Sequence, residues 1–120
     1  MPQQTIQVDT LAEAYLTLLK DRGIDYLFGN AGTDFASVIE ALSKSITEGT
    51  KAPTPLTIPH ENLAVAMAHG YYLATGRPQA VMVHVNVGPA NAICGIMNAA
   101  RENVPILFTS GRTPLTESRL

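Results

Sequence analysis

The chain has 120 residues, 46% of them hydrophobic, and a formal net charge of −2 from eight Lys and Arg against ten Asp and Glu. This length fits one domain or part of one, and the apolar content excludes a disordered chain. The composition argues against a nucleic-acid partner, a membrane span and a signal peptide, and the single cysteine excludes an internal disulfide. We therefore expect a cytoplasmic protein with no nucleic-acid or membrane partner.

A helix and a strand are predicted in the first thirty residues. Thr10 and Glu13 have the spacing of a capping box, and apolar residues then recur at helical spacing. Gly23 is a typical residue to end such a helix. The short apolar run at 25–28 predicts a strand.

A second helix is predicted after a tight loop at 29–32. Thr33 or Asp34 can cap it, and the following segment, 43–55, is polar and contains proline, as expected of a surface connection. The predicted inner face of this helix consists of Phe35, Val38, Ile39 and Leu42.

The second half of the chain alternates between strand and helix patterns. The predicted elements are a strand at 56–58, a helix at 61–75 that ends at Gly76, a strand at 80–85, a turn at 86–89, a helix at about 90–101, a strand at 105–109 and a polar tail at 110–120.

This order, a helix followed by repeated strand–helix pairs, predicts an α/β fold with a parallel sheet and helices on both faces. The strand at 80–85 supports a sheet covered on both sides, because His84 is its only polar residue. Ligands of open parallel sheets bind beyond the carboxyl ends of the strands. The unusual polar residues of the chain gather in these positions, at 29–33, 59–61, 84–91 and 110–113.

Several common catalytic motifs are absent. The dinucleotide fingerprint, the phosphate-binding loop and the nucleophile elbow do not occur. His60 and Glu61 do not begin a zinc-protease motif, because Ala64 stands where the second histidine is required. Cys94 lies in a helix of small residues, and we interpret it as a buried core residue.

Glu61 and His84 each allow two interpretations. Glu61 opens a helix, where the helix dipole would stabilise the carboxylate and lower its pKa. However, it lies in a segment, 52–100, whose other charged residue is Arg77, and burial there would raise the pKa. His84 is either a hydrogen-bonded core histidine or a functional group. Similarly, residues 29–33 form either a simple turn and cap or a loop whose amides face a ligand.

Together these segments resemble the N-terminal pyrimidine-binding domain of thiamine-diphosphate enzymes of the acetolactate synthase and 2-oxo-acid decarboxylase family. The resemblance covers nearly the whole chain from about Asp9. The matching segments are Phe28-Gly-Asn-Ala-Gly-Thr33, His60-Glu-Asn62, Ala68 to Pro78, Gly88 with Asn91-Ala92, and Asn103-Val-Pro-Ile-Leu107 through Gly111.

The resemblance implies that Glu61 is the catalytic glutamate, which binds N1′ of the aminopyrimidine and favours the tautomer that deprotonates C2 of the thiazolium ring. It also implies that His84 acts in proton transfer, as in benzoylformate-decarboxylase-like members, and that Thr33 holds the substrate carboxylate. The residues implied to lie beside the cofactor are Asn30, Gly32, Gly88 and Asn91.

The chain also departs from acetolactate synthases. Ala31 replaces their usual Pro, Asn62 their usual Gln, and Asn86-Val87-Gly88 their Gly-Pro-Gly turn. The expected activity is therefore the broader one, decarboxylation or carboligation of a 2-oxo acid.

The family's diphosphate and Mg²⁺ site is expected to lie outside this sequence. Its Gly-Asp-Gly motif does not occur here, so we assign no metal ligand to this chain. Residues 1–120 are expected to form the pyrimidine-binding domain without its last helix and strand. The expected partner is a diphosphate-binding domain of the same or another subunit, within a homodimer or homotetramer. The alternatives are a non-catalytic interaction or regulatory module that pairs with a separate diphosphate-binding subunit, and a generic α/β ligand-binding domain.

Overall fold

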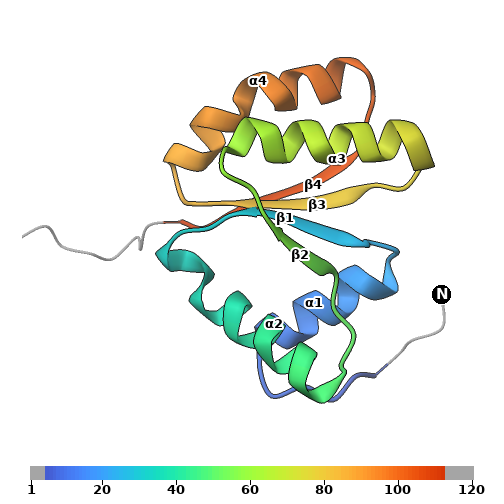
Figure 1. Ribbon diagram of the computed structural model, residues 1–120, viewed down its shortest axis with the longest axis vertical. Helices are drawn as coiled ribbons and strands as arrows, with labels where there is room; N and C mark the ends of the chain where they lie inside the picture. The colour runs from blue at the N-terminus through green and yellow to red at the C-terminus, as the bar shows by residue number, and fades with distance from the viewer. Residues whose placement is uncertain (1–4, 113–120) are drawn as a thin grey trace, which may run out of the picture.

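The computed structural model describes residues 5–112 and shows a parallel sheet between two layers of helices (Figure 1). Helices α1 and α2 cover one face, and α3 and α4 cover the other. The predicted fold class is thus confirmed. The elements are α1 (Leu11–Asp21), β1 (Tyr26–Asn30), the 3₁₀ turn η1 (Thr33–Phe35), α2 (Ala36–Glu48), β2 (Thr54–Thr57), α3 (Glu61–Thr75), β3 (Gln79–Val83), α4 (Val87–Arg101) and β4 (Ile106–Ser110).

The four strands are parallel and lie in the order β2-β1-β3-β4. The chain therefore builds outward from β1 in one direction to β2 and then in the other direction to β3 and β4. The strand order reverses between β1 and β3, and in open α/β sheets ligands bind at such a switch point, beyond the carboxyl ends of the strands. These ends lie together on the left of Figure 1.

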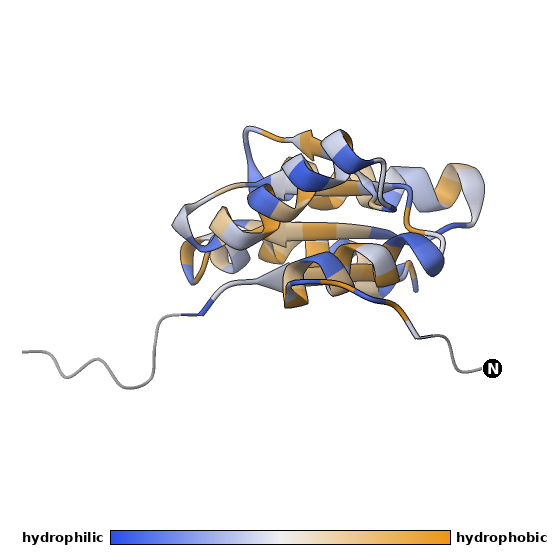
Figure 2. Cartoon of the chain, turned by 90° about the horizontal axis from the view of Figure 1, so that it is seen from below, coloured by the Kyte–Doolittle hydropathy of each residue, from blue (hydrophilic) through white to orange (hydrophobic). Residues whose placement is uncertain are grey.

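The sheet separates two hydrophobic clusters, because successive strand residues point to opposite faces. In β1 and β3, Leu27 and Ala80 face α1 and α2, whereas Phe28 and Val81 face α3 and α4. Figure 2 shows this hydrophobic layer running through the middle of the molecule. Every residue of β3 is buried: four of them are apolar, and the side chain of the fifth, Gln79, accepts hydrogen bonds from the Asp25 and Tyr26 amides.

Local signals place the ends of α1 and α3 correctly. The Thr10 side chain accepts a hydrogen bond from the Glu13 amide at 3.2 Å, which confirms the predicted cap of α1. Helix α3 begins at Glu61 and ends at Thr75, as predicted, and Gly76 adopts the left-handed conformation at φ 69° that terminates it.

The predicted start and inner face of the second helix are partly wrong. Neither Thr33 nor Asp34 caps α2 through its side chain; they lie in η1, and Asp34 bonds to distant segments instead. Ile39 is 54% exposed, and Ala41 takes its place in the core. The helix also continues into the predicted connection as far as Glu48.

Several apolar or small side chains lie on the outside of their helices. Leu11 is 86% and Leu18 is 51% exposed, because the buried side of α1 consists of Leu16 and Leu19. Cys94 is exposed on α4, so its interpretation as a core residue is wrong. Among the described residues, no helix has the length and apolar character required to cross a bilayer.

Candidate functional site

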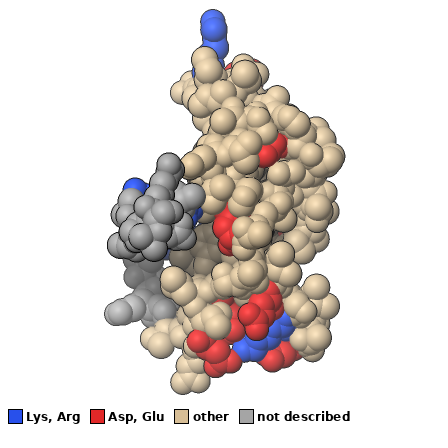
Figure 3. Space-filling model, turned by 90° about the vertical axis from the view of Figure 1, so that its left-hand side faces the viewer, with Lys and Arg blue, Asp and Glu red and all other residues tan. Residues whose placement is uncertain are grey.

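The residues singled out from the sequence lie in the segments that follow the carboxyl ends of the strands. This edge of the sheet faces the viewer in Figure 3, where the surface is hollowed near the middle and isolated acidic atoms are surrounded by uncharged ones. The side chains at this edge form two separate hydrogen-bonded groups. The first contains Glu61 and Asn91, and the second is built around Asp34 and His84.

Glu61 is buried at the first position of α3, with 6% of its surface exposed. Its Oε2 accepts a hydrogen bond of 3.1 Å from the side-chain amide of Asn91, which projects from the first turns of α4. His60 caps α3 by accepting a hydrogen bond from the Asn62 amide. The carboxyl group is thus held by the close packing of α3 against α4.

The loop after β1 contains three further candidates. Asn30 ends β1 and donates a hydrogen bond of 2.9 Å from its side chain to the carbonyl oxygen of Ile58, which joins the ends of β1 and β2. Gly32 lies against the His84 ring, so closely that a side chain at this position would collide with it. Thr33 is exposed, which leaves its hydroxyl accessible at this edge.

His84 follows β3 and is half-buried, with 32% of its side chain exposed. Its Nδ1 lies 2.5 Å from Oδ1 of Asp34, so the two side chains bridge the gap between the ends of β1 and β3. The other carboxylate oxygen of Asp34, Oδ2, accepts hydrogen bonds from the Val85 amide at 3.3 Å and the Gly111 amide at 3.1 Å. We call Asp34, His84, Val85 and Gly111 the Asp34 cluster.

The carboxyl group of Asp34 is held in its charged form. Burial opposes this charge, but the hydrogen bonds from His84, from the Val85 amide and from its own amide outweigh burial and lower the pKa of Asp34. The cluster therefore places a fixed negative charge at the switch point of the sheet.

Gly88 lies at the start of α4 and serves the packing of that helix. A Cβ at this position would lie 2.7 Å from both Cβ and Cγ2 of Val83, the last residue of β3. The missing side chain thus lets α4 approach the end of the sheet. The predicted turn at 86–89 is partly wrong, because α4 already begins at Val87.

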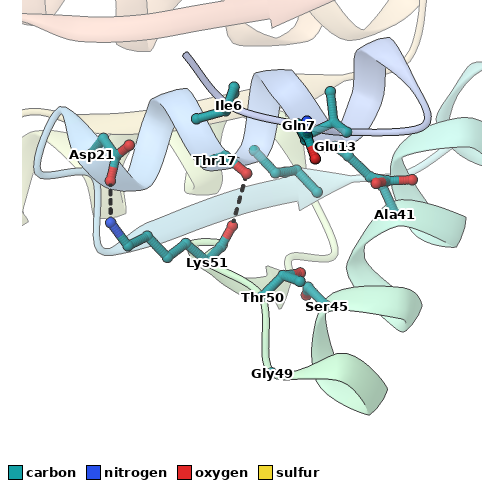
Figure 4. A pocket seen from close by; sticks show the side chains of 12 residues that line it. Ile6, Gln7, Glu13, Thr17, Asp21, Ala41, Ser45, Gly49, Thr50 and Lys51 are labelled. Atoms are coloured by element: carbon teal, nitrogen blue, oxygen red, sulfur yellow. Dashed lines mark hydrogen bonds and ion pairs between the residues drawn. The ribbon is translucent and has the colours of Figure 1, made fainter. Parts of the chain in front are cut away.

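A separate cavity of about 350 Å³ lies in the layer of α1 and α2 (Figure 4). Two of its lining polar residues contact Lys51: Asp21 pairs with the Lys51 ammonium group at 2.9 Å, and Thr17 donates a hydrogen bond to the Lys51 carbonyl oxygen. None of the candidate residues lines this cavity. Across residues 5–112, no group of three or more His, Cys, Asp and Glu side chains is arranged to hold a metal ion.

The contribution of Asp34 and Gly111 to this edge is not recognisable in the sequence pattern. The pattern indicates Asp34 only as a helix cap, because it stands four residues after the end of β1 and just before α2. Its partners His84 and Gly111 are 50 and 77 residues away in the sequence, so no local pattern could identify them.

Comparison with known proteins identifies the family. Residues 9–119 match the family model described as "Thiamine pyrophosphate enzyme, N-terminal TPP binding domain". The chain is 35% identical over 101 residues to the acetolactate synthase large subunit of Haemophilus influenzae, covering 84% of this chain and 17% of that protein. It is 30% identical over 103 residues to the benzoylformate decarboxylase of Pseudomonas aeruginosa, covering 86% and 18%.

The fold is similar to that of a solved relative. The structure matches the benzoylformate decarboxylase of Polynucleobacter necessarius with a TM-score of 0.71 and 20% sequence identity. The match covers 87% of this chain and 18% of that one. The chain thus spans less than a fifth of the length of these relatives. The family model covers nearly the whole sequence, and the chain belongs to the N-terminal, pyrimidine-binding domain family of thiamine-diphosphate-dependent enzymes.

Proposed function

We propose that this domain supplies the aminopyrimidine-binding half of a thiamine-diphosphate site in an enzyme that decarboxylates or joins 2-oxo acids. The observation that carries the proposal is the buried carboxyl group of Glu61, held by Asn91 at the carboxyl edge of the sheet. Membership of the family and similarity to acetolactate synthase and benzoylformate decarboxylase support the substrate class.

The surroundings of Glu61 suit a nitrogen heterocycle as its ligand. Among the described residues, Glu61 is the one charged side chain that is buried, and no Lys, Arg or His there forms an ion pair with it. A carboxyl group removed from water requires hydrogen-bond partners. Asn91 supplies one of them, and a ring nitrogen of the aminopyrimidine is chemically suited to supply another. The donor set therefore fits the cofactor that the family implies.

Thiamine diphosphate, when bound, supplies the carbon nucleophile for reactions of 2-oxo acids. In this proposal Glu61 shares a proton with N1′ of the aminopyrimidine, and Asn91 keeps the carboxyl group in place. Asn30, Gly32 and Gly88 line the cofactor at the edge of the sheet.

The substrate is assigned to the neighbouring side chains. Thr33, whose hydroxyl is exposed, binds the substrate carboxylate, and His84 transfers a proton through its imidazole.

The diphosphate group and Mg²⁺ are assigned to a second domain. We propose that this domain, or a second subunit of a homodimer or homotetramer, covers the outer faces of α3 and α4. Both helices expose large apolar side chains there, which is typical of interaction surfaces. These side chains, between 37% and 64% exposed, are Leu63, Met67, Leu73, Val87, Ile93 and Met97.

The proposal is tested with Glu61→Gln in the complete enzyme. Deuterium exchange at C2 of bound thiamine diphosphate, followed by acid quenching and proton NMR, should slow by about 10²-fold or more, as expected for loss of an acid–base group. Glu40→Gln is the matched control, because Glu40 is exposed on α2 and away from the site. Exchange at a near-normal rate in Glu61→Gln would refute the assignment.

A second experiment distinguishes the alternative function. The apolar faces of α3 and α4 also suit a non-catalytic module that pairs with a separate diphosphate-binding subunit. That alternative is supported if the wild-type chain forms a stable complex with such a subunit but the complex binds no thiamine diphosphate in calorimetric titration.

A further inference from the structure

We propose that Asp34 is a positioning residue that keeps the proton of the neutral His84 ring on Nδ1, so that Nε2 is the nitrogen available to a ligand. This inference rests on the proposed function only for the role of His84 in the reaction. The arrangement itself follows from the contacts of the Asp34 cluster.

The two oxygens of the Asp34 carboxylate have different partners. Oδ2 accepts hydrogen bonds from the Val85 and Gly111 amides, at 3.3 and 3.1 Å, and these donors belong to the segments after β3 and β4. Oδ1 faces Nδ1 of His84 at 2.5 Å. Because backbone amides anchor one oxygen, the carboxylate cannot rotate freely, and the other oxygen is aimed at the imidazole.

Two glycines make this close approach possible. A Cβ on Gly32 would overlap the His84 ring, and a Cβ on Gly111 would overlap Oδ2 of Asp34. Gly32 has extended backbone angles that any residue can adopt, so the requirement at this position is for space. Asp34, in η1, therefore contacts the segments that follow β3 and β4, and Gly32, in the loop after β1, packs against its partner His84.

A neutral imidazole carries its proton on one nitrogen only, and the hydrogen bond made by that nitrogen decides which one. An anionic carboxylate can only accept, so Asp34 requires a proton on Nδ1. Nε2 then carries the free lone pair and can accept a proton from a ligand. The His84 side chain is 32% exposed, which leaves it accessible at the switch point.

Asp34→Asn should invert this arrangement. The amides of Val85 and Gly111 need an acceptor, so the carbonyl oxygen of the introduced side-chain amide should take the place of Oδ2. The NH₂ group of that amide then replaces Oδ1 and donates to Nδ1 of His84. The ring must move its proton to Nε2, as in a catalytic triad whose aspartate is replaced by asparagine.

The test is the imidazole ¹⁵N spectrum of the full chain, recorded at a pH where His84 is neutral. We expect the Nδ1–H tautomer in the wild type and the Nε2–H tautomer in Asp34→Asn. Asp21→Asn is the matched control, because Asp21 pairs with Lys51 outside the cluster, and it should keep the wild-type tautomer. The wild-type spectrum also provides a test that does not depend on the folding of any variant. A predominantly Nε2–H ring in the wild type, or the Nδ1–H tautomer retained in a folded Asp34→Asn chain, overturns the inference.

The failure of this inference is distinguishable from the failure of the proposed function. The tautomer is measured without thiamine diphosphate or turnover, whereas the Glu61→Gln test does not involve Asp34. In the complete enzyme, an inverted tautomer with an unchanged kcat would overturn the proton-transfer role of His84, while leaving its positioning by Asp34 intact.

Discussion

Replacement of Gly88 by alanine should destabilise the domain. The added Cβ would lie 2.7 Å from two carbon atoms of Val83 and 3.2 Å from its carbonyl carbon. Val83 is completely buried, so it has no free space into which to move. Overpacking of this kind costs about 1–3 kcal/mol, and the better helix propensity of alanine offsets at most about 1 kcal/mol. We therefore expect a net loss of about 1–2 kcal/mol.

Urea unfolding followed by circular dichroism measures this loss. With a typical slope of about 1–3 kcal/mol per molar urea, a loss of about 1–2 kcal/mol lowers the midpoint by roughly 0.3–2 M. Gly70→Ala is the matched control, because Gly70 lies within α3 and a Cβ there meets no atom within 4 Å. That variant should gain about 0.5–1 kcal/mol from helix propensity. Equal midpoints for the two variants would contradict the close packing of α4 on β3.

Three further predictions concern stability and exposure. Because the pKa of Asp34 is lowered in the folded protein, its charge stabilises the fold above about pH 4, and this contribution is lost on acidification. The difference in unfolding free energy between wild type and Asp34→Asn should therefore narrow below about pH 4. A difference that widens below this pH would contradict the hydrogen bonds to Asp34. Gln79→Leu should lower the free energy of unfolding in urea by about 2–4 kcal/mol, because the completely buried Gln79 side chain accepts hydrogen bonds from the amides of Asp25 and Tyr26. A free energy within about 0.5 kcal/mol of the wild-type value would show that these amides find other partners. In the chain without its partner domain, Cys94 should react with a thiol reagent about as fast as in urea, and strong protection there would show that the chain itself buries the thiol.

The local patterns of the sequence determined much of the fold. The capping box at Thr10, the helix from Glu61 to Thr75 and its end at Gly76 depend on interactions between residues a few positions apart, so they can be recognised in the sequence. The alternation of strand and helix patterns likewise predicted a parallel sheet, because parallel strands need a long crossover between them.

Periodicity was less informative about which side of a helix is buried. It identifies an apolar stripe, but the neighbouring elements decide how much of that stripe is covered. Leu18 and Ile39 are therefore exposed on the flanks of their helices, and Cys94 lies outside on α4. Ala41, a small residue with a weak apolar signal, is buried instead.

The candidate site could likewise be predicted from the sequence only in part. Glu61 was recognisable in the sequence because a charged residue is unusual in a charge-poor segment and because the surrounding residues resemble a known family. The order of the strands, the contact between Glu61 and Asn91 and the Asp34 cluster depended on the tertiary structure. The physical reason is that the cluster joins residues separated by 50 to 77 positions, which only the packing of the strands brings to one edge of the sheet.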